Sequence, residues 1–161
     1  MSELLKLSHA IFGVWFLAAL FGRWVTLAVA ARATDVRAIP PMLTVSSRFE
    51  QMVRTVPLAV LALGIATAIS QGRPFLGPLQ GAPVDWLFAS LLIFLSPLPL
   101  VPLVFLPRGR IFESALEEAT QAGQITPGLN AAFRDRVVLA GHAYELGAML
   151  VVLALMIAKP F

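Results

Sequence analysis

The chain has 161 residues, of which 58% are hydrophobic and only 13% are charged, a composition too apolar for an ordinary soluble domain. Its net charge is only +3, with 12 basic and 9 acidic residues, and the basic residues are spread between apolar runs, which argues against a nucleic-acid-binding surface. The sequence contains no cysteine, so disulfides, thiolate nucleophiles and cysteine-ligated metals are excluded. The expected partner is therefore the lipid bilayer.

Four apolar segments are long enough, at about 20 residues each, to cross a bilayer as helices. They cover residues 5–30, 49–70, 86–106 and 134–158. We therefore predict an all-α protein, a single integral membrane domain over residues 1–161 that forms a four-transmembrane-helix bundle. The segment 112–123 has helix-forming composition and ends at Gly123, so it predicts a short extramembrane helix between the third and fourth spans. Thr126 and Pro127 then supply an N-cap and a first-turn proline.

The third span contains three prolines, Pro97, Pro99 and Pro102. Each leaves a backbone carbonyl without its helical donor, so we expect this span to be kinked or locally unwound. No charged residue lies in 87–106, which argues against an ion-coordinating broken helix.

The distribution of Lys and Arg predicts the orientation in the membrane. Seven arginines flank the loops 31–47 and 107–133, whereas the opposite side has only Lys6, Arg73 and Lys159. Both termini should face outward, and loops one and three should lie in the cytoplasm of a bacterium, with the protein in its plasma membrane.

Five ionisable residues should meet in the cytoplasmic half of the bundle: Arg23, Glu50, Arg54, His142 and Glu145. If Arg136 marks the membrane edge, a rise of about 1.5 Å per residue places His142 roughly 9 Å deep and Glu145 roughly 13 Å deep. Residues at this depth usually pair with one another or line a functional site. Their formal charges balance if His142 is neutral.

Each of these residues also has a simpler interpretation. Ser47 and Glu50 fit a capping box at the start of the second span, and Glu50 and Arg54 have the spacing of a helical ion pair. Arg23 fits a side chain that extends toward the membrane surface. Glu145 fits a salt bridge with Arg54 or Arg23, and His142 a hydrogen bond to a neighbouring carbonyl.

The other histidine, His9, should lie near the opposite face of the membrane from His142, so a single haem held between the two is not expected. Each remains a candidate for a single axial ligand. His142 and Glu145 reverse the order of the di-iron motif and have no second copy, so we predict no metal site.

Several segments resemble an uncharacterised family of bacterial four-helix integral membrane proteins. They are LLKLSHAIFGVWFLAALFGR (4–23), DWLFASLLIFL (85–95), FLPRGR (105–110) and LALMIAKPF (153–161). The first helix is also distantly similar to the membrane domain of copper-resistance D proteins and to the haem-binding membrane protoporphyrinogen oxidase. This likeness implies that His9 is a haem or metal ligand, with haem b as the possible cofactor, although residues 86–106 contain no lysine to serve as the partner ligand of haem.

The sequence favours a non-enzymatic role as an accessory or scaffolding membrane protein, within a larger membrane complex or a homo-oligomer. Apolar surface dominates, the extramembrane parts are short, and the polar groups balance as a network. Two alternatives remain open. One is a haem-binding redox protein that uses His9 or, less favoured, His142. The other is passage of protons or small solutes near Glu145.

Overall fold

The computed structural model describes residues 2–160, and all regular structure within this range is helical. The helices are α1 (Ser2–Ala30), α2 (Ile39–Ser70), α3 (Trp86–Leu95), α4 (Leu106–Ala122), α5 (Pro127–Phe133) and α6 (Arg136–Ala158). Short 3-10 helices, η1 (Val36–Ala38) and η2 (Gly77–Gln80), lie in the first two loops, and a π-helical turn, η3 (Val101–Phe105), precedes α4. The predicted all-α class is confirmed.

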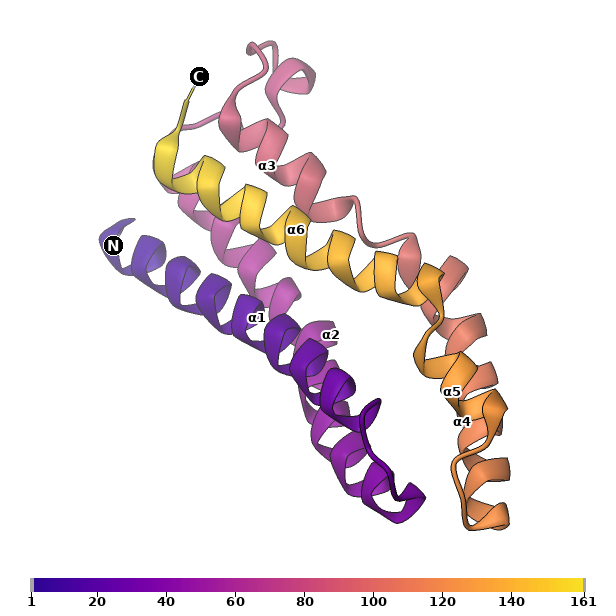
Figure 1. Cartoon of the computed structure of the whole chain (residues 1–161). Coiled ribbons are helices and arrows are strands. Elements are labelled where there is room, and N and C mark those ends of the chain that lie inside the picture. The colour runs from indigo at the N-terminus through magenta and orange to yellow at the C-terminus, as the bar shows by residue number, and fades with distance from the viewer. Residues whose placement is uncertain (1, 161) are drawn as a thin grey trace.

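The helices form two groups (Figure 1). α1 and α2 run antiparallel and pack against each other along much of their length, while α6 packs against α3 and also contacts α1. α4 and α5 form a small hairpin beyond the far end of α3 and α6. The polar loops at the two ends of this arrangement are separated by the long apolar helices.

Three helical stretches within the described residues are long and apolar enough to cross a membrane: Glu3–Ala30, Val36–Ser70 and Pro127–Ala158. They coincide with the first, second and fourth predicted spans. The predicted third span is not one of them, because its regular α-helix, α3, has only 10 residues and rises about 15 Å. The residues between α3 and α4 form a turn and η3, and residue 106 already belongs to α4.

The predicted break in the third span is present and falls on its prolines. α3 ends at Leu95, and the chain turns through Pro97 and Pro99 before η3 begins. Ser96, which follows α3, forms a hydrogen bond with Tyr144 of α6, with 2.7 Å between the two hydroxyl oxygens. The prolines remove helical donors, and the chain continues through tighter turns, in which the Leu98 and Leu100 amides donate to the Leu95 and Pro97 carbonyls, before the wider η3.

The second helix begins ten residues earlier than predicted, at Ile39. Pro40 and Pro41 occupy its first turn, where a missing N–H costs nothing because those amides have no helical acceptor. Ser47 therefore lies inside the helix, and its Oγ donates to the Thr44 carbonyl at 2.8 Å. The predicted capping box is wrong.

The ends of α4 and α5 follow their local sequence signals. α4 begins six residues before the predicted start and ends at Gly123, whose φ of 67° is a left-handed conformation that favours glycine. Thr126 caps α5 by accepting a hydrogen bond from the Leu129 amide at 3.2 Å. Asp135 caps α6 by accepting from the Val137 amide at 2.9 Å.

Two apolar clusters hold the helices together. One joins α1, α2 and α6 and consists of Phe16, Leu20, Val56, Val60, Ala148 and Met149. The other joins η1 and the start of α2 to the α4–α5 hairpin and consists of Val36, Ile39, Ala119 and Leu129.

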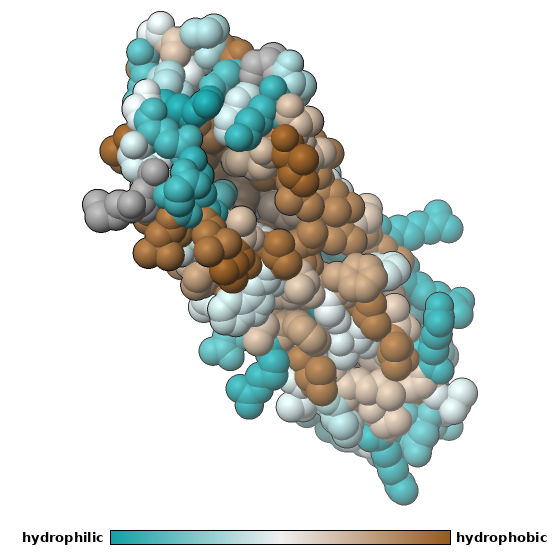
Figure 2. Space-filling view, turned by 90° about the vertical axis from the view of Figure 1, so that its left-hand side faces the viewer, coloured by the Kyte–Doolittle hydropathy of each residue, from teal (hydrophilic) through white to brown (hydrophobic). Residues whose placement is uncertain are grey.

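Many large apolar side chains outside these clusters are exposed. Figure 2 shows apolar residues over the middle of one face and hydrophilic residues toward its two ends, the pattern of a surface that faces lipid.

Candidate functional site

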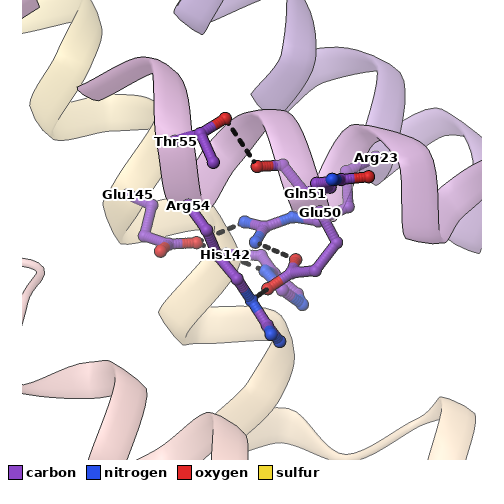
Figure 3. A network of polar contacts seen from close by, with 7 residues as sticks. All are labelled: Arg23, Glu50, Gln51, Arg54, Thr55, His142 and Glu145. Atoms are coloured by element: carbon purple, nitrogen blue, oxygen red, sulfur yellow. Dashed lines mark hydrogen bonds and ion pairs between the residues drawn. The ribbon is translucent and has the colours of Figure 1, made fainter. Parts of the chain in front are cut away.

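The candidate site is centred on Arg23 of α1, whose side chain is only 5% exposed. Its Nη1 donates to Oε2 of Glu50 on α2 at 2.8 Å, and its Nη2 donates to Oε2 of Glu145 on α6 (Figure 3). One guanidinium therefore connects three helices that are far apart in the sequence. Arg23 does not extend to the membrane surface as the sequence suggested. It is a buried ion-pair partner.

A close approach of α1 and α2 positions the first of these ion pairs. Gly22 has no side chain, and a Cβ there would lie 2.6 Å from the ring of Phe49. The ring fills that notch, and Glu50 is the next residue on α2. The small residue before Arg23 thus allows the two helices to bring the ion pair together.

Arg54 completes the network on its exposed side. Its Nε donates to Oε1 of Glu50 at 3.2 Å, as the spacing of one helical turn predicted. The Arg54 side chain is 68% exposed, whereas that of Glu145 is 10% exposed. Of the two partners considered for Glu145, the structure selects Arg23.

His142 lies beside this network and not against a backbone carbonyl. Its Nδ1 is 3.4 Å from Oε2 of Glu145, and its ring stacks on Phe105 with centroids 4.7 Å apart and planes 14° from parallel. Phe105 also approaches Gly141, where a Cβ would lie 3.0 Å from the ring. Gly141 thus makes room for the Phe105 ring, whereas a Cβ at Gly147 would meet nothing within 4 Å.

The structure brings all five predicted residues together, and we call them the polar cluster: Arg23, Glu50, Arg54, His142 and Glu145. Two arginines face two glutamates, so the formal charges balance with a neutral histidine. Balance is important at this depth because a buried charge without a partner is costly. The Nε of Arg23 is buried and has no hydrogen-bond partner within the described residues.

Two contributors were not predicted from sequence. Phe105 lies in η3 and stacks on the His142 ring. The π-helical turn that places it there cannot be predicted from the spacing of apolar residues in the sequence. Arg108 of α4 forms an ion pair with Asp135, the N-cap of α6. The sequence contained a signal for this second pair, since Arg108 directly follows the third apolar segment and Asp135 lies at the start of the fourth.

The polar cluster lines a cavity of about 660 Å³ between the two helix groups. Most of its wall is apolar and includes Leu27, Leu58, Leu98 and Val101. The cavity lies between the two apolar clusters, because it borders Phe16 and Met149 at one end and Phe112 and Phe133 at the other. Mostly apolar walls with a small number of polar groups are typical of small-molecule binding sites.

His9 lies apart from the polar cluster, on the wall of a second cavity of about 420 Å³. Its Nδ1 is 3.0 Å from the carbonyl oxygen of Val60, so Nδ1 carries the proton and the lone pair of a neutral ring is on Nε2. A Cβ on Gly64 would lie 2.9 Å from His9 Cε1, so this glycine makes room for the ring. Lys6 and Ser90 also line the cavity.

Long apolar helices joined by short polar loops, with ionisable groups paired between the helices, define a helical integral membrane protein. A family model described as "Predicted integral membrane protein (DUF2269)" matches residues 3–160. Because the match covers nearly the whole chain, the protein belongs to this family. Comparison with curated proteins and with solved structures finds no significant match.

Proposed function

We propose that the protein is an accessory or scaffolding membrane protein whose polar cluster fixes the arrangement of α1, α2 and α6. The observation that supports this role most is the position of Arg23, which is buried and paired with carboxylates from two other helices. Interhelical ion pairs of this kind specify which faces of helices meet, a choice that apolar packing alone makes weakly in lipid. The partners would be lipid together with other copies of the chain or other subunits of a complex.

A functional assay combined with a folding assay tests this role. We expect Glu145→Gln, Arg54→Gln and His142→Ala to lower stability, with a larger loss where the replaced side chain is more buried. Any activity should fall only in proportion to the amount of folded protein that is lost. If all three variants stay folded and yet abolish a measurable redox or transport activity, the scaffolding role is wrong.

We further propose that the chain crosses a bacterial plasma membrane four times, with α3 and the proline-rich turn as the third, broken crossing. Both termini would face outward, and loops one and three would face the cytoplasm. The basic residues that flank those two loops support this orientation.

Because the chain has no cysteine, single cysteines can test this topology directly. Gln80 in the second loop and Ser114 on α4 are both exposed. A membrane-impermeant maleimide should label Gln80→Cys in intact cells, and should label Ser114→Cys only after the membrane is permeabilised. Labelling in the reverse pattern would invert the proposed topology.

A second candidate function is haem binding through His9, and the tautomer of this ring favours it. The Val60 carbonyl holds Nδ1 as the donor, which is how histidine ligands of metals are usually oriented, and leaves Nε2 free to bind iron. Haem would supply one-electron chemistry at this site. Within the third apolar segment no lysine is present to act as a second ligand.

An absorption spectrum tests this candidate. Protein purified after haem-supplemented expression should show a Soret band that His9→Ala removes and His142→Ala retains. A haem-free, colourless preparation, or a band that survives His9→Ala, would exclude His9 as the ligand.

A further inference from the structure

The second cavity reaches from the middle of the apolar helices to the end of the molecule where both termini and the second loop lie (Figure 1). Phe16 and Phe94 line it toward the middle, whereas Lys6, Trp86 and Lys159 line it at that end. The last three stand at the start of α1, the start of α3 and the end of α6. Most of the wall is apolar. In a bilayer, the basic end would lie at the lipid–water interface, with the apolar wall at the depth of the acyl chains.

Three basic residues gather at this end, and we call Lys6, Arg73 and Lys159 the basic cluster. Trp86 brings two of them together, since Cζ of Arg73 lies 5.6 Å and Nζ of Lys159 lies 5.5 Å from the centroid of its ring. Trp86 itself is buried. Lys6 lines the same cavity as Lys159. The first helix, the second loop and the end of the last helix thus each contribute one cation.

Local backbone structure fixes the position of Lys159. α6 ends at Ala158, and Lys159 has a φ of 45°, a left-handed conformation that residues other than glycine rarely adopt. Its amide still donates to the Leu155 carbonyl at 2.9 Å, but Pro160 cannot continue the helix because it has no N–H to donate. Such a conformation persists where the surrounding contacts require it. Here the contact is the ammonium of Lys159 over the ring of Trp86.

The basic cluster lacks matching carboxylates. Within residues 2–160, neither Arg73 nor Lys159 forms an ion pair. Glu3 pairs with Lys6 at 2.7 Å, and Asp85 caps α3. None of the described residues that line the second cavity is acidic, whereas the lining of the first cavity contains more carboxylates than arginines. The second cavity therefore favours an anion at its basic end and hydrocarbon against its wall.

We propose that the second cavity binds one anionic phospholipid, with the phosphate at the basic cluster and an acyl chain along the apolar wall. A zwitterionic phospholipid carries its own ammonium, which the basic cluster repels. A free phosphate lacks the hydrocarbon that the apolar wall would bury. This inference goes beyond the scaffolding role, which rests on the polar cluster, and beyond haem binding, which rests on His9.

Titration of the full chain in neutral detergent micelles tests the proposal, with native mass spectrometry to count bound lipid and thermal unfolding to measure its effect. A ligand that binds the folded state raises Tm in a saturable manner. Dioctanoylphosphatidylglycerol should raise Tm and appear bound at one equivalent, whereas dioctanoylphosphatidylcholine and inorganic phosphate should do neither. Equal stabilisation by the zwitterionic lipid, or by phosphate without a chain, overturns the proposal.

Charge variants locate the head group. Arg73→Gln and Lys159→Gln should each weaken phosphatidylglycerol binding about fivefold, the effect of one basic side chain near a membrane surface. Both residues are exposed, so neither change should impair folding. The matched control is Arg37→Gln in η1, which is also exposed but lies at the other end of the molecule and should bind normally. Equal results for all three variants, whether a loss or normal binding, would refute this position of the head group.

A pair of glycines locates the acyl chain. Gly13 of α1 lines the cavity, and a Cβ there would meet nothing within 4 Å. Gly13→Leu should therefore fold and yet weaken binding at least about tenfold, since it displaces about two methylene groups of the chain. Gly147→Leu on α6 is the matched control, because its Cβ is equally unobstructed but the residue lies outside both cavity linings. Normal binding by Gly13→Leu would refute the placement of the chain in this cavity.

A histidine variant separates this proposal from haem binding. His9→Ala removes the candidate haem ligand but leaves the basic cluster and most of the apolar wall in place. It should retain the preference for phosphatidylglycerol, whereas Arg73→Gln and Lys159→Gln lose it. A preference that disappears in His9→Ala and survives in the two charge variants would overturn the proposal.

Discussion

Replacement of Arg23 by methionine should destabilise the protein by about 3–5 kcal/mol, because the buried carboxylate of Glu145 loses its arginine and keeps only the contact with His142 at 3.4 Å. Methionine retains much of the volume of the side chain, so the effect reports charge more than packing. Glu50 is affected less, since it keeps its contact with Arg54. Reversible unfolding in mixed micelles measures the loss.

The matched control for this prediction is Arg54→Met. It removes a charge of the same type from the same network, but from a side chain that is 68% exposed. We expect a cost below about 1 kcal/mol, as for exposed ion pairs generally. Equal losses for Arg23→Met and Arg54→Met would show that burial of Arg23 does not determine the stability of the cluster.

The second large effect is expected at Gly141, which provides the space for Phe105. A leucine there would overlap the aromatic ring, since even its Cβ would approach to 3.0 Å. The ring also stacks on His142, so it cannot move without giving up that contact. Overpacking of this kind typically costs about 1–3 kcal/mol.

Gly147→Leu on the same helix is the control for Gly141→Leu, because a Cβ at Gly147 meets nothing within 4 Å. That substitution should be neutral or slightly stabilising, since leucine favours a helix by up to about 1 kcal/mol relative to glycine. Thermal unfolding of the two variants side by side separates the effects. A Gly141→Leu variant as stable as Gly147→Leu would contradict the close packing of α6 against η3.

The length of the apolar segments predicted the long helices well. The helix boundaries were predicted less well, because a proline can either interrupt a helix or start one. Pro97 and Pro99 interrupt a helix, as predicted, because they lie within it. Pro40 and Pro41 were assigned to a loop, yet they start a helix, because the first turn has no use for the missing N–H. Sequence alone does not show on which side of a helix boundary a proline falls.

The members of the polar cluster were predictable from depth and charge, but their pairing was not. Whether Glu145 meets Arg23 or Arg54 depends on how each helix is rotated about its axis. That rotation is set by contacts such as Gly22 against Phe49 and Gly141 against Phe105, which join residues distant in sequence. The π-helical turn that carries Phe105 is likewise a response to three nearby prolines and to packing on α6.

The central claim is that the Arg23–Glu145 pair couples α1 to α6, and a double-mutant cycle tests it most directly. Arg23→Met, Glu145→Met and the double variant are compared by unfolding under the same conditions. The double variant should recover part of the loss, with a coupling free energy of at least about 1.5 kcal/mol. Losses that add to within about 0.5 kcal/mol would contradict the claim, because they would mean that the two side chains do not stabilise one another.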